Sequence, residues 1–284
     1  MNRLLIIGGT GTVGREVVSQ LTHTEAQVRV MTRDPEKARL PEPAQAVYGD
    51  LTRPETLDDC SKDIDTVFLV WVAPPATVAP VIERIARRVQ RIVFLSAPLK
   101  TPHPLFQQPN AARDLGVKIE SAIEASGAQW TFLRPGMFAA NATEWWGEQI
   151  RAGSVVRWPY LDVPTAPIDP RDIAAVAVRA LLEEKHVNAE YVLTGPQSLS
   201  HREQLSIIGG VIGRSLEIQE MSPDQARREL LAIMPLPVIN MLLNAWAAAS
   251  GQPALVTSTV KEITGMPART FLDWARDHAT AFQA

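Results

Sequence analysis

The sequence predicts an α/β fold, with a doubly wound parallel sheet and a smaller, mixed and mostly helical carboxy-terminal subdomain. Strand and helix signals alternate from the start to about residue 135, which is typical of parallel strands joined by helices. The segment 67–72 is apolar without interruption, as strands covered on both faces are. Beyond Pro135 the alternation stops and helical signals dominate, which indicates the second, smaller part.

The first part contains the elements that such a sheet requires. We expect strands at residues 3–8, 27–31, 44–48, 66–72, 91–96 and 130–134. We expect helices at residues 15–22, 54–60, 79–89 and 111–125. Because parallel strands need crossover connections, these helices should cover both faces of the sheet.

The second part should return once to the sheet and then continue as helices. Asp169 and Pro170 cap and start a helix that runs to about Leu182, and residues 190–193 form a further strand. Capping boxes open two later helices, at Ser200-x-x-Glu203 and Ser222-x-x-Gln225.

These signals divide the chain into two interleaved parts. We place a sheet domain at residues 1–135 and a subdomain at residues 136–284, with residues near 168–195 returning to the sheet. Ligands of doubly wound sheets bind at the carboxyl ends of the strands. The subdomain should therefore supply the walls that surround a substrate.

The loop after the first strand has the glycine spacing of a dinucleotide-binding turn. Gly9, Gly11 and Gly14 fit G-x-G-x-x-G, and Gly8 begins an overlapping G-x-x-G-x-x-G. Such glycines permit a tight turn, the approach of a pyrophosphate and close packing of the next helix. That helix offers free N–H groups and its positive dipole end to the phosphates. We therefore expect a Rossmann domain that binds the cofactor with Gly8, Gly9, Thr10, Gly11, Thr12, Val13 and Gly14.

The end of the second strand favours NADPH over NADH. Arg33 follows Gly14 by 19 residues, where dinucleotide folds place the residue that contacts the adenosine ribose, and Lys37 lies one turn further. A guanidinium can pair with the 2′-phosphate and stack on adenine. Asp34 beside it tempers this preference and leaves NADH as an alternative, and Arg33 could instead be a solvated loop cation.

Composition excludes several other classes of function. The 284 residues carry a net charge of −3, so there is no basic surface that would indicate nucleic acid or an anionic membrane as partner. The single cysteine, Cys60, and the absence of signal-peptide or transmembrane patterns indicate a reducing, cytoplasmic location. No His, Cys and carboxylate group has the spacing of a metal site.

The chain resembles the NmrA-like members of the atypical, extended-type short-chain dehydrogenase/reductase superfamily. The resemblance rests on the glycine loop, on Gly49-Asp50-Leu51, on Phe94-Leu95-Ser96 and on the segments 32–38, 130–141, 168–174 and 191–196. It implies that Asp50 and Leu51 border the adenine. It also implies that further residues contact the cofactor: Val70, Trp71, Val72 and Ser96, and, near the nicotinamide, Pro135, Gly136, Met137 and Phe138.

One part of the superfamily pattern is missing. Catalytic members use Tyr-x-x-x-Lys, in which the lysine lowers the pKa of the proton-donating tyrosine. If Glu120 is the family's helix glutamate, Gly116 stands at the lysine position and Ala112 at the tyrosine position. The catalytic residues are therefore unknown.

Four polar side chains are candidates for that role, each with a simpler alternative. Ser96 could bond a substrate oxygen or cap its strand, and Asn141 could orient substrate or only form a turn. Lys118 could replace the missing lysine or be a solvated helix residue. His103 could be an acid near the fifth strand or a surface-loop residue.

Aromatic residues gather where the substrate should lie. We expect the pocket to include Trp71, Phe138, Asn141, Trp145, Trp146, Trp158 and Tyr160. Aromatic faces stack on planar rings, so these residues would suit a flat, conjugated substrate. They could equally form a core or an oligomer surface.

The sequence thus favours an NADPH-dependent oxidoreductase that transfers hydride to a planar conjugated acceptor of the quinone, azo, enone or aromatic polyketide type. Such acceptors delocalise the charge that hydride brings, so a strong protein acid is less necessary. The alternative is a non-catalytic NmrA-type redox sensor that acts through a protein partner; an isomerase is a weaker option. A small-molecule substrate is expected, and the oligomeric state stays open, a homodimer included.

Overall fold

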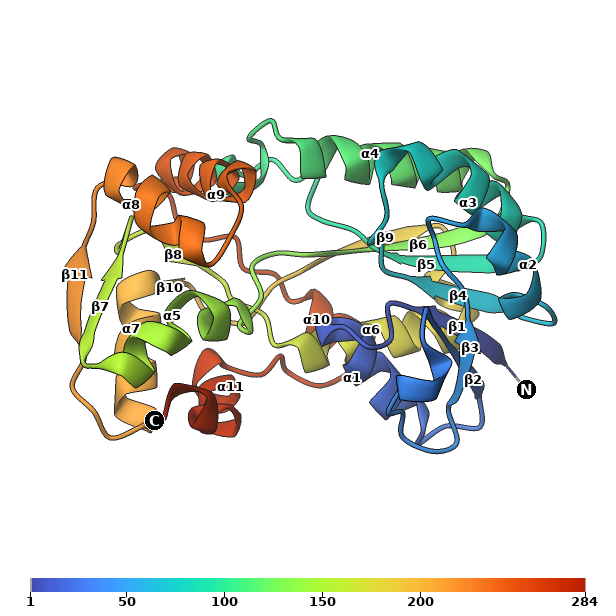
Figure 1. Cartoon of the computed structure of the whole chain (residues 1–284), viewed down its shortest axis with the longest axis horizontal. Coiled ribbons are helices and arrows are strands. Elements are labelled where there is room, and N and C mark those ends of the chain that lie inside the picture. Colours follow the sequence, from blue (N-terminus) through green and yellow to red (C-terminus); the bar gives the residue numbers. More distant parts are fainter. Residues whose placement is uncertain (1, 284) are drawn as a thin grey trace.

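Seven parallel strands form one sheet in the computed structural model, which describes residues 2–283 (Figure 1). Their order is β3-β2-β1-β4-β5-β6-β9, so the chain reverses direction across the sheet after β3 and the strand ends beside β1 and β4 lie at a switch point. The strands are β1 (Arg3–Ile7), β2 (Gln27–Thr32), β3 (Gln45–Tyr48), β4 (Thr66–Leu69), β5 (Arg91–Leu95), β6 (Gln129–Pro135) and β9 (Ala189–Leu193).

Helices cover both faces of this sheet. On one face α1 (Thr12–Leu21) packs against α6 (Pro170–Leu182), and α6 also contacts α10 (Thr259–Thr264). The opposite face carries α2 (Leu57–Cys60), α3 (Val78–Ala86) and α4 (Ala111–Ala125). Each face has its own apolar core, because alternate strand residues point to opposite sides.

The second part of the chain lies beyond the carboxyl ends of these strands (Figure 1). Its own apolar core is separate from the two cores of the sheet. Two small sheets pair β8 with β10 and β7 with β11. Its elements are α5 (Asn141–Ala152), β7 (Val155–Trp158), β8 (Pro164–Thr165), β10 (Leu199–Ser200), α7 (His201–Val211), β11 (Glu217–Glu220), α8 (Pro223–Glu229), α9 (Leu236–Ala249) and α11 (Phe271–Asp277).

Short 3₁₀ turns complete the connections. They are η1 (Pro35–Lys37), η2 (Pro54–Thr56), η3 (Pro75–Thr77), η4 (Pro104–Phe106), η5 (Glu184–His186), η6 (Leu230–Ala232) and η7 (Ala279–Phe282). Four of them begin with proline, whose fixed φ suits the first position of a helical turn.

The predicted α/β fold is confirmed. Both predicted capping boxes are present, with the Ser200 and Ser222 side chains accepting the N–H groups of Glu203 and Gln225. The strand predicted at 66–72 ends at Leu69, because the chain leaves the sheet there and the Trp71 indole donates to Ala73 O at 2.6 Å. The two small sheets were not predicted, since strands of two to four residues carry too short a pattern.

Candidate active site

The glycines after β1 serve different purposes in the structure. Gly8 has a φ of +84°, which side chains rarely permit. A Cβ on Gly14 would lie 2.1 Å from Gly8 O, so only glycine lets α1 start this close to the strand. A Cβ on Gly11 would meet nothing nearer than 3.4 Å. The protein itself therefore gives no steric reason for glycine at position 11, whereas a phosphate approaching the backbone would.

The start of α1 suits such an anion. Its N-cap is Gly11, so no side chain caps the first turn, and that turn contains no acidic residue. Thr10, Gly11 and Thr12 are exposed. Uncapped N–H groups at the positive end of a helix bind phosphate, and the loop therefore fits the pyrophosphate of a dinucleotide.

A groove of about 320 Å³, the cofactor groove, continues from this loop along the ends of β1, β2, β3 and β4. Six residues expected to contact the cofactor line it: Gly8, Thr10, Arg33, Asp50, Leu51 and Val72. The remaining lining residues are Ile7, Met31, Thr32, Asp34, Gly49, Thr52 and Ala73. Short segments that each follow a strand thus converge on one edge of the sheet.

Charge in this groove is unevenly distributed. Lys37 forms an ion pair with Asp34 at 2.7 Å, whereas Arg33 is exposed and forms no ion pair within residues 2–283. Asp50 accepts from the N–H and the hydroxyl of Thr52, both at 2.8 Å, and the N–H bond above all lowers the pKa of the Asp50 carboxyl. Arg33 is therefore the cation most available to an anionic ligand here.

Several residues expected at the cofactor support the groove from behind. A Cβ on Gly9 would collide with Val30 at 2.6 Å, and Val13 is buried in the core under α1. Val70 packs over Gly8. Trp71 packs against the core on the α2–α3 face and lines neither the groove nor the cavity described next.

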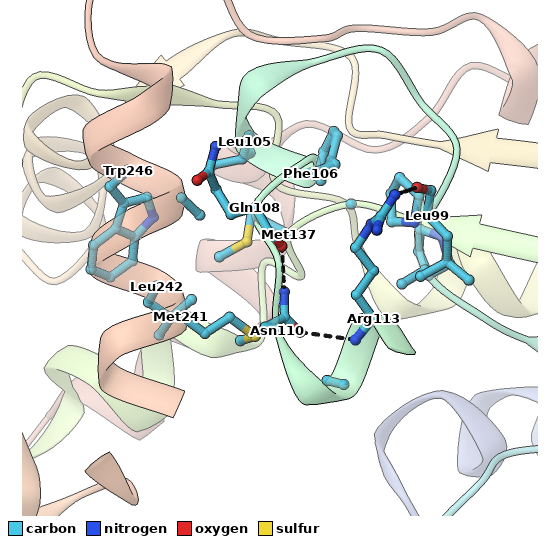
Figure 2. Close-up of a pocket in the computed structure, with 16 residues that line it drawn as sticks. Leu99, Leu105, Phe106, Gln108, Asn110, Arg113, Met137, Met241, Leu242 and Trp246 are labelled. Carbon is cyan, nitrogen blue, oxygen red and sulfur yellow. Dashed lines mark hydrogen bonds between the residues drawn. The ribbon is translucent and has the colours of Figure 1, made fainter. Parts of the chain in front are cut away.

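A second hollow, the apolar cavity, opens where β5 and β6 end and has a volume of about 260 Å³. Figure 2 shows Met241, Leu242 and Trp246 of α9 on one side and Leu99 and Arg113 on the other. The polar side chains on its wall are Gln108, Asn110 and Arg113. The other lining residues are Ala97, Pro98, Leu105, Phe106, Ala112, Pro135, Gly136, Met137 and Ala245.

Most of the aromatic residues expected around the substrate lie elsewhere. Trp145, Trp146 and Trp158 belong to the core of the second part, where the rings of Trp145 and Trp158 stack at 5.3 Å. Trp146 and Trp158 are fully buried. The expectation that they line the pocket is corrected by this packing, because the rings cover one another and α7 (through His201) closes over them.

The remaining pocket candidates also lie outside the apolar cavity. Phe138 packs with the core under α6 and bridges to Ile168, and Tyr160 is half-buried at a turn with φ +51°. Asn141 is the first residue of α5. The structure brings Pro135, Gly136 and Met137 to the cavity, together with Trp246, which the sequence did not single out.

A buried charged network stands at the ends of β5 and β6. Arg134, almost fully buried, donates to Glu120 at 3.0 and 2.7 Å and pairs with Glu190 at 2.7 Å. The Ser96 hydroxyl donates to Glu120 Oε1 at 2.7 Å. Its proton is therefore engaged, which leaves the Ser96 oxygen as an acceptor toward the site.

The positions matched to tyrosine and lysine hold no catalytic group. Ala112 contributes a methyl to the apolar cavity, and Leu99 Cδ1 lies 3.0 Å from where a Cβ on Gly116 would be. Lys118 is exposed and donates to Pro75 O at 2.9 Å. His103 caps η4 and contacts Pro253 O at 2.9 Å, so its ring ties two loops together.

Taken together, the fold and the glycine loop define a dinucleotide-binding protein of the Rossmann class. The chain belongs to the NAD(P)H-binding family, whose model matches residues 8–184. The resemblance to NmrA-like, atypical short-chain dehydrogenases/reductases is confirmed, and the chain is an NAD(P)H-dependent oxidoreductase.

Relatives of known activity match along almost the whole chain. A (4-alkanoyl-5-oxo-2,5-dihydrofuran-3-yl)methyl phosphate reductase from Streptomyces griseus is 38% identical, covering 98% of this chain and 99% of that protein. An NAD(P)H azoreductase from Xenophilus azovorans is 33% identical, covering 99% of both. The structure of an NADPH-dependent quinone oxidoreductase from Escherichia coli superimposes with a TM-score of 0.81 at 20% identity, over 96% of this chain and 98% of that one, and shows the same fold.

Neither a membrane span nor a metal cluster is found in residues 2–283. None of the helices there has both the length and the apolar character needed to cross a membrane. No cluster of three or more His, Cys, Asp or Glu side chains in the same range is arranged to hold a metal ion.

Proposed function

We propose that this chain is an NADPH-dependent reductase that transfers hydride to a planar conjugated acceptor of the quinone, azo, enone or aromatic polyketide type, held in the apolar cavity. The observation that carries the proposal is the placement of that cavity at the same sheet edge as the cofactor groove, with Ala112 and Gly116 where a catalytic pair would stand. The reduced nicotinamide supplies the hydride when it is bound.

Different residues bind the cofactor and the acceptor. Arg33 offers its guanidinium to a 2′-phosphate, and the open space at Gly11 receives the pyrophosphate. Pro135, Gly136 and Met137 line the apolar cavity where β6 ends. Helix α9 closes the opposite side with apolar side chains, which hold a flat acceptor and exclude water.

No protein acid is required for acceptors of this kind. A quinone, azo or enone group spreads the incoming negative charge over its conjugated system, and water can deliver the proton afterwards. Ser96 would accept rather than donate a hydrogen bond, because its own proton is bonded to Glu120. The azoreductase and furanone phosphate reductase activities named for two relatives support acceptors of this class.

A screen of cofactor oxidation with matched variants tests the proposal. We expect NADPH oxidation with quinones, azo compounds or enones and little with simple ketones. Ala112→Phe should fill the apolar cavity and lower kcat/KM at least about tenfold, with the cofactor Kd unchanged. Ala111→Phe is the matched control, since Ala111 is exposed on the same turn and does not line the cavity.

The redox-sensor alternative gives a different result in the same screen. If no acceptor oxidises the cofactor, but oxidised and reduced cofactor bind with different affinities and change the binding of a protein partner, the reductase proposal is overturned. Equal loss of activity in Ala112→Phe and Ala111→Phe would instead contradict the claim that the acceptor binds in the apolar cavity.

A further inference from the structure

One cation stands in the wall of an otherwise apolar cavity. Among the described residues that line the apolar cavity, Arg113 is the charged one, and no Asp or Glu is present. Arg113 lies in the first turn of α4, next to Ala112. A ligand that fills this space must therefore satisfy an apolar surface and a guanidinium at once.

The Arg113 guanidinium has no ionic partner among the residues that the structure describes. Nη2 donates to Leu99 O at 3.0 Å, which fixes its direction against the loop after β5. Nε is buried and has no hydrogen-bond partner within residues 2–283. No carboxylate in that range forms an ion pair with Arg113.

Three other arginines that are at least partly buried have carboxylate partners. Arg3 pairs with Asp65, Arg171 with Asp169 and Asp277, and the buried Arg134 with two glutamates. These pairs follow the general rule that a charge removed from water is compensated by a partner. Arg113 has no carboxylate partner within residues 2–283. Arg91 has no ion pair in that range either, but it donates to two backbone carbonyls and does not line the apolar cavity, whereas Arg113 does.

The surroundings of Arg113 favour an anion further. Asn110 accepts the Arg113 N–H at 2.8 Å and caps the 15-residue helix α4, so the favourable charge at this point comes from the Arg113 guanidinium and the helix dipole rather than from free N–H groups (Figure 2). The acidic residue of this turn, Asp114, is exposed and does not line the cavity. A guanidinium offers donors in a planar fork that matches carboxylate and phosphate oxygens.

We propose that Arg113 is a specificity residue that selects acceptors carrying a carboxylate or phosphate attached to the conjugated body. This inference rests on the proposed function for the identity of the acceptor. The anionic group binds the Arg113 guanidinium, and the apolar body extends past Met137 toward Met241 and Trp246 of α9. Arg113 thereby fixes which end of the acceptor lies at α4.

Three azobenzenes test this selection: azobenzene-4-carboxylate, its methyl ester and 4-phenylazophenyl phosphate. Binding is measured on the full chain with NADP⁺, so that nothing is turned over, through quenching of tryptophan fluorescence. We expect the carboxylate or the phosphate to bind about ten- to a hundredfold tighter than the ester, as a charge-assisted hydrogen bond implies. Arg113→Gln should remove that difference and change the ester's Kd less than about threefold.

A charge-matched control separates a local effect from a general one. Arg87→Gln removes the same charge from the exposed end of α3, away from the cavity, and should leave all three Kd values unchanged. In turnover with NADPH, Arg113→Gln should raise KM for the anionic azobenzene and leave kcat nearly unchanged.

The outcomes distinguish this inference from the proposed function. Equal Kd values for the three azobenzenes, or a preference that survives Arg113→Gln, would overturn the role of Arg113. If the anion preference depends on Arg113 but none of the acceptors tested oxidises NADPH, the anion site would be supported and the reductase proposal would be overturned.

Discussion

The cofactor groove and the apolar cavity lie on the same edge of one sheet but are built in different ways. The groove is assembled from short loops that each follow a strand, near residues 8, 33, 50 and 72. The cavity joins the 97–113 segment and the end of β6 to α9, which lies more than 100 residues further along the chain. The difference shows that a site made by the loops after strands can be predicted from short segments of the sequence. A site that a distant helix closes cannot be predicted in this way.

The largest expected effect breaks the groove at Gly11. Gly11→Val should abolish cofactor binding, because the side chain would occupy the space that a pyrophosphate needs, while the fold has room for it. Titration calorimetry measures binding and circular dichroism the fold. Gly210→Val is the control, since a Cβ there also meets open space but lies in α7. Normal cofactor affinity in Gly11→Val would mean that the glycine loop is only a turn and does not bind the pyrophosphate.

The second prediction concerns the pH dependence of stability that the buried His201 should cause in the core of the second part. His201 is fully buried among tryptophans, with one ring nitrogen 3.0 Å from Tyr160 O, and burial lowers its pKa to about 4. Between pH 6.5 and pH 4 the unfolded chain, with a histidine pKa near 6.5, therefore binds more protons than the folded chain. The free energy of unfolding consequently falls as the pH is lowered through that window.

Unfolding by urea at pH 7 and pH 4 measures this linkage. The free energy of unfolding should drop by roughly 3 kcal/mol more in the parent protein than in His201→Gln, because each tenfold difference in proton affinity between the folded and unfolded chains is worth about 1.36 kcal/mol. The comparison with the variant removes the contributions of other titrating groups. An equal drop in both proteins would mean that His201 accepts a proton within the folded core.

A smaller effect is expected on the preference of the cofactor groove for NADPH over NADH. Arg33→Ala should weaken NADPH binding roughly ten- to a hundredfold, the worth of a charge-assisted hydrogen bond, and leave NADH affinity nearly unchanged. Lys37→Ala should matter less, because Lys37 already pairs with Asp34. Calorimetry with both cofactors decides the matter. Equal affinity of the parent protein for NADPH and NADH would contradict this role of Arg33.

The sequence was informative about the sheet and the glycine loop for a physical reason. Strand and helix periodicities, and the need for glycine beside Gly8 O, act within a few residues. The bounds predicted for α4 agree with the structure, and its cap Asn110 lies immediately before it. By contrast, Trp145, Trp146 and Trp158 were expected to line the pocket and instead fill a core, because aromatic clustering alone does not say which side of a helix is covered.

The residues that the sequence did not reveal depend on contacts between distant elements. Trp246 and Met241 lie on a helix that is apolar on most sides, so its pattern does not show which face meets η4. Arg113 looks like an ordinary helix cation until the structure places it in the cavity wall. A run of apolar residues in α9 opposite a loop with several prolines was the signal that could have suggested a cover for the site.

The central claim is that hydride passes to a conjugated acceptor without a protein acid. Stopped-flow measurement of pre-bound NADPH, mixed with menadione or with the bicyclic aliphatic ketone 1-decalone, tests it most directly. We predict that menadione oxidises the cofactor at least about a hundredfold faster, a barrier difference near 2.7 kcal/mol, and that Tyr160→Phe stays within about tenfold of the parent. Comparable rates for the two acceptors, or loss of the menadione reaction in Tyr160→Phe, would contradict the account.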